Sequence, residues 1–297
     1  MTRTNFRPIF PIAGMTFAYV TLWSLGHAQP PGYGENAAAI AGLIEQAAQS
    51  PTPRDAEGHP ILSGYWEPPS GGPDPFGNSE LRTNDEGAIL VFPDFATVAN
   101  VNALDVSNVE RRWEDKSLRP RYKPEYQARA DELFRAGDLN DPSYSCALPG
   151  VPRIGAPREI VQTLDAVYLL YEGEVNRFRV IPTDGRSHDP DRDPMANGDA
   201  VGSWDGDTLV VDVRNLAEDT WIDKDGSFHS PEMRVVERFT RKGNTLTYDV
   251  TVEDPYFAEP FNPKPTTLIL AEQGTHLLQE WPCLEMSRDH MINSTKH

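Results

Sequence analysis

The second half of the chain alternates between short apolar runs and glycines, and this pattern limits the possible folds more than any other feature. After Pro157 the runs are rich in β-branched, aromatic and Leu residues. Single glycines separate these runs, at Gly173, Gly185, Gly206, Gly226, Gly243 and Gly274. Short strands separated by regularly spaced turn residues are typical of antiparallel sheets, and we expect roughly nine strands between Arg158 and Cys283.

Two segments show the pattern most clearly. In Thr245–Val252, apolar and aromatic residues alternate with Thr and Asp, which predicts a strand with one buried and one solvated face. The segment from Trp204 to Asp212 predicts a hairpin, because its Asp205-Gly206 pair supplies the positive backbone dihedrals of a tight turn.

The predicted fold class is therefore mainly β. Because no βαβ alternation interrupts the strands, an antiparallel meander that closes into a calycin- or lipocalin-like barrel is the economical solution, since closure removes exposed edges. A two-sheet sandwich is the alternative. We assign the barrel domain to residues 146–297.

Residues 1–28 have the pattern of a secretory signal peptide. Arg3 and Arg7 precede an apolar stretch, and Gly26-His27-Ala28 offers small residues at the cleavage site. A membrane anchor is the alternative, but Pro11 and Gly14 interrupt the stretch. We expect a periplasmic or secreted protein that keeps no stable membrane span after processing.

The expected compartment is oxidising, and the chain has two cysteines. We predict that Cys146 and Cys283 form a disulfide.

Residues 29–145 are expected to form an N-terminal helix and a long Pro/Gly-rich wrapping segment. Apolar residues from Ile40 to Ala47 recur at helical spacing after a possible cap at Asn36, and Pro51 ends the pattern. A second helix is predicted over Pro124–Ala136, with proline at its first position and Gly137 beyond its end.

Charge and missing motifs exclude several classes of function. The chain carries 27 Lys and Arg against 45 Asp and Glu, so its net charge of -18 would repel nucleic acid. It has no Gly-x-Gly-x-x-Gly, phosphate loop, His-Glu-x-x-His, Gly-x-Ser-x-Gly or Cys-x-x-Cys. A nucleotide cofactor, a zincin site and an α/β-hydrolase serine are disfavoured, and we expect no cofactor.

Glu237 is the first candidate for chemistry. On the strand Met233–Phe239 it shares a face with apolar residues, where a carboxylate is costly unless it is paired. It is either a general acid or the partner of an arginine across the strands.

The hairpin Val167–Pro182 supplies a second group. Tyr168 and Glu172 share one face of the first strand, Tyr171 lies on the other, and the returning strand carries two arginines, Arg177 and Arg179. A guanidinium holds a carboxylate bidentately, and a tyrosine donates a hydrogen bond or a proton. The alternative is a solvated charged face with structural tyrosines.

Two loops complete the set of candidates. The loop Asp184–Asp193 contains Arg186 and His188, which could bind a carboxylate or move a proton, although an exposed loop histidine is the ordinary interpretation. Its acids only begin a calcium-loop pattern, because Pro194 replaces the glycine that the loop needs. Asp223 and His229 could meet across the turn at Gly226.

Several motifs resemble those of a large family of secreted, mostly uncharacterised bacterial proteins. The resemblance spans most of the mature chain and is carried by the segments 54–66, 146–153, 177–188, 202–212, 220–223 and 236–239. Within that group the chain is similar to cofactor-independent decarboxylases of carboxylated phenylcoumaran dimers derived from lignin. Its expected architecture also resembles phenolic acid decarboxylases, barrels that use Tyr, Arg and Glu without metal or nucleotide.

The resemblance implies a carbon-carbon lyase whose partner is a small aromatic carboxylate. In this hypothesis Arg179 orients the carboxylate, and Tyr168 or Tyr171 hydrogen-bonds the substrate. Glu237, Glu172 or His188 handles the proton. The alternatives are a non-catalytic barrel carrier of a hydrophobic small molecule and a cofactor-free dehydratase, isomerase or hydrolase that uses Asp223 and His229. A structural protein that binds a partner through its Pro-rich segment is a further alternative.

Overall fold

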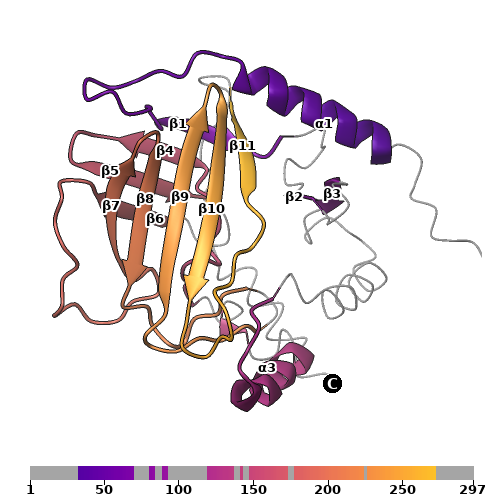
Figure 1. Ribbon diagram of the computed structural model, residues 1–297, viewed down its shortest axis with the longest axis vertical. Coiled ribbons are helices and arrows are strands. Elements are labelled where there is room, and N and C mark those ends of the chain that lie inside the picture. Colours follow the sequence, from indigo (N-terminus) through magenta and orange to yellow (C-terminus); the bar gives the residue numbers. More distant parts are fainter. Residues whose placement is uncertain are drawn as a thin grey trace, which may run out of the picture.

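The structure is a computed structural model that describes residues 33–69, 80–83, 89–92, 119–136, 141–142, 147–172, 177–223 and 226–271 (Figure 1). The predicted signal peptide and the predicted disulfide between Cys146 and Cys283 lie outside these residues.

Nine antiparallel strands form a nearly closed barrel, which confirms the predicted class. The strands follow one another in the order β6-β5-β4-β1-β11-β10-β9-β8-β7. Their bounds are β1 Gly64–Glu67, β4 Glu159–Gln162, β5 Ala166–Tyr171, β6 Arg177–Pro182, β7 Asp199–Asp205, β8 Thr208–Arg214, β9 Arg234–Lys242, β10 Thr245–Glu253 and β11 Thr266–Leu270.

One strand of the barrel comes from the predicted wrapping segment. β1 pairs with β4 on one side and with β11 on the other, so it joins the two halves of the sheet. Its Trp66 is completely buried, and the indole Nε1 donates a hydrogen bond to the carbonyl of Leu62. The segment before the barrel domain is therefore a structural part of the barrel and not only a cover.

The two ends of the sheet, β6 and β7, come close together at Gly202. A Cβ atom on Gly202 would lie 2.9 Å from a methyl group of Ile181 and 3.0 Å from that of Thr183. Only a residue without a side chain allows the backbone of β7 to approach β6 this closely. Gly202 is thus part of the seam at which the barrel nearly closes.

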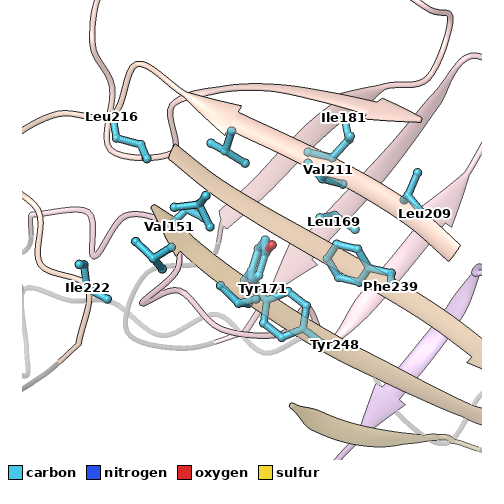
Figure 2. Packing of buried hydrophobic residues seen from close by; sticks show 14 of the residues in the cluster. Val151, Leu169, Tyr171, Ile181, Leu209, Val211, Leu216, Ile222, Phe239 and Tyr248 are labelled. Carbon is cyan, nitrogen blue, oxygen red and sulfur yellow. The ribbon is translucent and has the colours of Figure 1, made fainter. Parts of the chain in front are cut away.

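Alternation along the strands fills the interior. On β10, Leu246, Tyr248, Val250 and Val252 are buried, as the sequence pattern predicts. On β9 the buried residues are Val235, Glu237, Phe239 and Arg241. Side chains from β5, β8, β9 and β10 meet inside the barrel (Figure 2).

Two helices of the described ranges flank the barrel. α1 (Tyr33–Ala48) begins before Asn36, so the predicted cap at Asn36 is wrong; asparagine is only moderately unfavourable inside a helix, and the chain is already helical before it. α3 (Pro124–Ala136) has the predicted bounds. A separate hairpin pairs β2 (Glu80–Thr83) with β3 (Ile89–Phe92). Among the described residues, no helix is long and apolar enough to cross a membrane.

The end of α1 docks onto the turn between β9 and β10. The amide of Asn244 donates a hydrogen bond to the carbonyl of Ala47, and the amide of Gly243 donates to Oγ1 of Thr52. The turn thereby satisfies a carbonyl at the helix C-terminus that has no partner within the helix.

Candidate functional site

Four polar side chains from four strands meet inside the barrel. They are Tyr171 on β5, Arg179 on β6, Glu237 on β9 and Tyr248 on β10, and we call them the interior cluster. Their inward orientation follows from strand alternation, because Leu169, Ile181, Phe239 and Leu246 on the same strands and faces are also buried. Figure 2 shows Tyr171 and Tyr248 pointing into the space that Phe239 also occupies.

An ion pair forms the centre of the cluster. The two terminal nitrogens of Arg179 donate to the two carboxylate oxygens of Glu237 at 2.9 and 2.6 Å. The Tyr248 hydroxyl donates to Oε1 of Glu237 at 2.9 Å, and Nη1 of Arg179 also donates to the Tyr171 hydroxyl oxygen at 3.1 Å. The side chains of Arg179 and Glu237 are 3% and 0% exposed, so the charges are shielded from water.

One strong donor of the cluster has no acceptor. The Nε–H of Arg179 is buried and makes no hydrogen bond in the part of the chain that the structure describes. An arginine has five N–H donors, and a buried donor without an acceptor is costly. The side edge of the Arg179 guanidinium is therefore a polar position in the cluster that can take an additional acceptor.

Burial controls the protonation of both tyrosines. It raises the pKa of Tyr171 to about 12, against the opposing effect of Arg179. Burial and the Glu237 carboxylate raise the pKa of Tyr248 well above its ordinary value. Burial alone would lower the pKa of Arg179, but the Glu237 carboxylate outweighs that effect and raises it. At neutral pH both tyrosines of the cluster are thus protonated phenols, of which Tyr248 donates to Glu237, and Arg179 is a cation.

The structure brings together three of the predicted site residues and separates the others. Tyr168 faces outward and is 38% exposed, because alternation on β5 turns it away from Tyr171. Glu172 accepts a hydrogen bond from the Tyr65 hydroxyl at 3.0 Å. The backbone of Arg177 pairs with that of Tyr171, and its side chain lies outside the described part of the structure.

The loop candidates contact other partners. Nδ1 of His188 lies 2.9 Å from Oδ2 of Asp199, and its Nε2 lies 3.5 Å from Oδ2 of Asp212. Arg186 pairs with Asp184 on the surface. Neither residue belongs to the interior cluster, because their loop runs outside the barrel wall.

Asp223 and His229 are also held by separate partners. Both oxygens of Asp223 accept hydrogen bonds from Ser227, within the same turn. His229 is buried, with Nε2 2.9 Å from the Thr220 hydroxyl and Nδ1 2.9 Å from the Ser230 carbonyl. Burial lowers the pKa of His229, so the ring is neutral at neutral pH.

Tyr248 is the cluster residue that the sequence analysis did not single out. The two-residue turn at Gly243 and Asn244 places Lys242 opposite Thr245, and the same register sets Glu237 opposite Val250. Tyr248 then lies on the same face, one alternation away from Glu237. A register derived from this turn would have identified it.

Two cavities lie outside the interior cluster. The larger has a volume of about 790 Å³ and lies between the loops that flank β7, β8, β9 and β10. The smaller, of about 310 Å³, is lined by the segment Asp55–Ile61 and by Trp204, whose ring stacks on His59 at 4.6 Å. Within the described ranges, no group of three or more His, Cys, Asp or Glu residues is arranged to hold a metal ion.

Comparisons with models of protein families, with curated proteins and with solved structures give no match. The interior cluster, with its buried ion pair and the Nε–H of Arg179 that has no acceptor among the described residues, is therefore the candidate site.

Proposed function

We propose that the protein is an exported, cofactor-independent carboxy-lyase that decarboxylates a phenolic aromatic carboxylic acid, such as a lignin-derived dimer. The proposal is supported above all by the buried Nε–H of Arg179, which has no acceptor among the residues that the structure describes. A carboxylate is the acceptor whose geometry best matches the edge of a guanidinium. The sequence resemblance to lignin-dimer decarboxylases points to the same chemistry.

Arg179 can bind a substrate without losing Glu237. Glu237 occupies the terminal edge of the guanidinium, while the side edge carries the Nε–H that has no acceptor among the described residues and would be the donor to a second carboxylate. Because Glu237 already balances the charge, this second carboxylate is oriented by hydrogen bonds more than by a net cation. Weak ionic stabilisation of the bound carboxylate favours its loss as neutral carbon dioxide.

The remaining cluster residues suit the proton transfers of such a reaction. The phenol of the substrate loses a proton, and the carbon that bears the carboxylate gains one, which gives a quinone-methide-like intermediate. The carbon-carbon bond then breaks, its electrons restore the aromatic ring as a phenolate, carbon dioxide leaves, and the phenolate takes up a proton. Overall, one proton replaces one carbon dioxide, so no oxidant or reductant is needed.

Tyr171 and Glu237 are assigned distinct roles in this scheme. The Tyr171 hydroxyl accepts from Arg179, and its own proton is available to hydrogen-bond the substrate. Glu237 handles the proton in contact with the Tyr248 hydroxyl. We do not assign the proton transfer to Glu172 or His188, because both residues lie outside the interior cluster.

Product analysis tests the proposal directly. Purified full-length protein, treated with a chelator, is incubated with a panel of lignin-derived phenolic carboxylic acids, and the products are identified by mass spectrometry. Loss of one carbon dioxide is expected. Saturable binding of an unchanged acid would instead indicate a carrier, and loss of water would indicate a dehydratase.

The Arg179→Lys variant tests whether the side edge of the guanidinium, and not only its charge, is needed for turnover. Lysine keeps a cation for Glu237 but has no second bidentate edge, so turnover should fall by about a hundredfold or more if the edge orients the substrate. Arg186→Lys is the matched control, because Arg186 is exposed and lies outside the cluster. Full turnover by a folded Arg179→Lys protein would refute the assignment.

A further inference from the structure

We propose that the larger cavity, here called the rim cavity, binds an organic cation that carries an apolar body. The cavity lies where β7 and β9 begin and where β8 and β10 end, and its volume is about 790 Å³. This volume is within the range of cavities that hold small organic ligands. Its wall combines carboxylates with exposed prolines.

Negative charge dominates the wall. Six carboxylates line the cavity, against two guanidinium groups, those of Arg214 and Arg234. Both arginines are already engaged, since Arg214 pairs with Asp212 and Arg234 bridges Asp212 and Glu253. The positive side chains of the wall are thus neutralised locally, which leaves an excess of negative charge.

Three of the carboxylates have no cationic partner within the described residues: Asp189, Asp254 and Glu232. They come from three separate segments of the chain. Asp254 is held in place because it accepts hydrogen bonds from the amides of Ser230 and Tyr256. Carboxylates that converge on one concave surface concentrate the negative potential there and attract cations.

The apolar part of the wall specifies the rest of the ligand. Phe257 and Met233 lie beneath the cavity and are buried, and the apolar surface that a ligand can reach is that of four exposed prolines: Pro190, Pro231, Pro255 and Pro260. Such a surface favours contact with an aromatic or aliphatic body. The class of ligand is therefore an ammonium or guanidinium group attached to an apolar body.

This inference is independent of the proposed decarboxylase. The proposed substrate is an anion, which the carboxylates of the rim cavity would repel, so the rim cavity and the interior cluster would take ligands of opposite charge. Arg179→Lys should leave cation binding unchanged, and this variant tells the two sites apart.

Two probes of similar shape and opposite charge test the rim cavity. Isothermal titration calorimetry on the purified full-length protein compares 2-phenylethylammonium with 3-phenylpropionate at low ionic strength. We expect one saturable site for the ammonium and at least about tenfold weaker binding of the carboxylate. Added salt should weaken the first interaction. Equal binding of both probes, or binding of neither, would overturn the proposal.

A pair of charge-removing variants locates the binding. The Glu232 carboxylate makes no hydrogen bond within the described structure, so Glu232→Gln should fold normally and lower the affinity for 2-phenylethylammonium by several-fold, about three to ten. Glu259→Gln removes the same charge from the same cavity, but Glu259 is already paired with Arg121 at 2.9 Å. We expect a clearly smaller effect for Glu259→Gln, and equal effects would contradict binding at the unpaired carboxylates.

Discussion

Arg179 and Glu237 connect two strands that are not neighbours in the sheet. Arg179 lies on β6 and Glu237 on β9, and their two hydrogen bonds of 2.9 and 2.6 Å cross the interior of the barrel. Since β6 is one end of the sheet, this ion pair tethers the strand next to the seam to the long central hairpin. The pair therefore contributes to the shape of the barrel as well as to the candidate site.

Removing one member of this ion pair should cost much more than removing both. Arg179→Met leaves the Glu237 carboxylate buried without a cation, and the expected loss of unfolding free energy is about 3–5 kcal/mol. The double variant Arg179→Met/Glu237→Leu removes the buried charge and should recover a large part of that loss. Urea unfolding of the wild type, both single variants and the double variant gives the coupling energy.

The surface pair Arg238 and Asp205 is the control for this cycle. It joins the same strand β9 to β7 at 2.8 Å, but its side chains are 41% and 70% exposed. We expect a coupling of less than about 1 kcal/mol there. Additive effects in the buried pair, equal to those in the exposed pair, would show that water still screens the interior cluster.

The docking of α1 can be measured with two glycines of nearly equal conformation. Gly243 and Gly206 each begin a two-residue hairpin loop, with φ of 59° and 58°. A Cβ on Gly243 would lie 2.6 to 2.9 Å from three carbonyl oxygens at the end of α1, whereas a Cβ on Gly206 would meet nothing within 4 Å. Both changes to alanine impose the same backbone strain, of about 1–2 kcal/mol.

Gly243→Ala should therefore destabilise the protein more than Gly206→Ala, by about 1–3 kcal/mol, because only the first also displaces the helix. Thermal or urea unfolding of the two variants measures the difference. If the two losses are equal, the end of α1 does not depend on its contact with this turn.

Replacing glycine by alanine should lower the stability of the protein at the seam of the barrel and raise it in α1. Gly202→Ala forces a methyl group against Ile181 and Thr183 and should cost about 1–3 kcal/mol. Gly42 lies in α1 with no atom within 4 Å of an added Cβ, so Gly42→Ala should stabilise the protein by about 0.5–1 kcal/mol. A neutral Gly202→Ala variant would mean that β6 and β7 can separate at little cost.

Local periodicity accounts for much of what the sequence predicted correctly. Alternation alone placed Glu237 on the buried face of β9, and it placed Tyr168 and Tyr171 on opposite faces of β5. On β5, alternation could not decide which of the two faces points into the barrel, because that choice depends on how the barrel closes. The candidate set consequently included Tyr168 and Glu172, which the structure places outside the interior cluster.

Contacts between distant segments were beyond local patterns. β1 joins the sheet from a Pro-rich region because Trp66 finds a buried position between β4 and β11, which both lie far along the chain, and no period within Gly64–Glu67 indicates this. The partners of His188 likewise depend on tertiary structure, since Asp199 and Asp212 lie on strands that follow the loop. The sequence showed a histidine among acids but not which acids it would contact.

The buried His229 should make stability depend on pH. Burial lowers its pKa in the folded protein below the ordinary value of 6.5, despite the opposing effects of the Ser230 carbonyl and Asp254. As pH falls below about 6.5, the unfolded chain binds a proton at this residue that the folded protein does not, so the stability contributed by neutral His229 is present above that pH and lost below it. The comparison is between wild type and His229→Gln, whose amide can hydrogen-bond but does not titrate.

Urea unfolding at each pH measures the difference. The wild type should lose more unfolding free energy than the variant between pH 8 and pH 5. Parallel pH profiles of the two proteins would mean that the pKa of His229 is the same in the folded and unfolded states. Because the other six of the seven histidines are present in both proteins, their contributions cancel in the difference, which therefore reports on His229 alone.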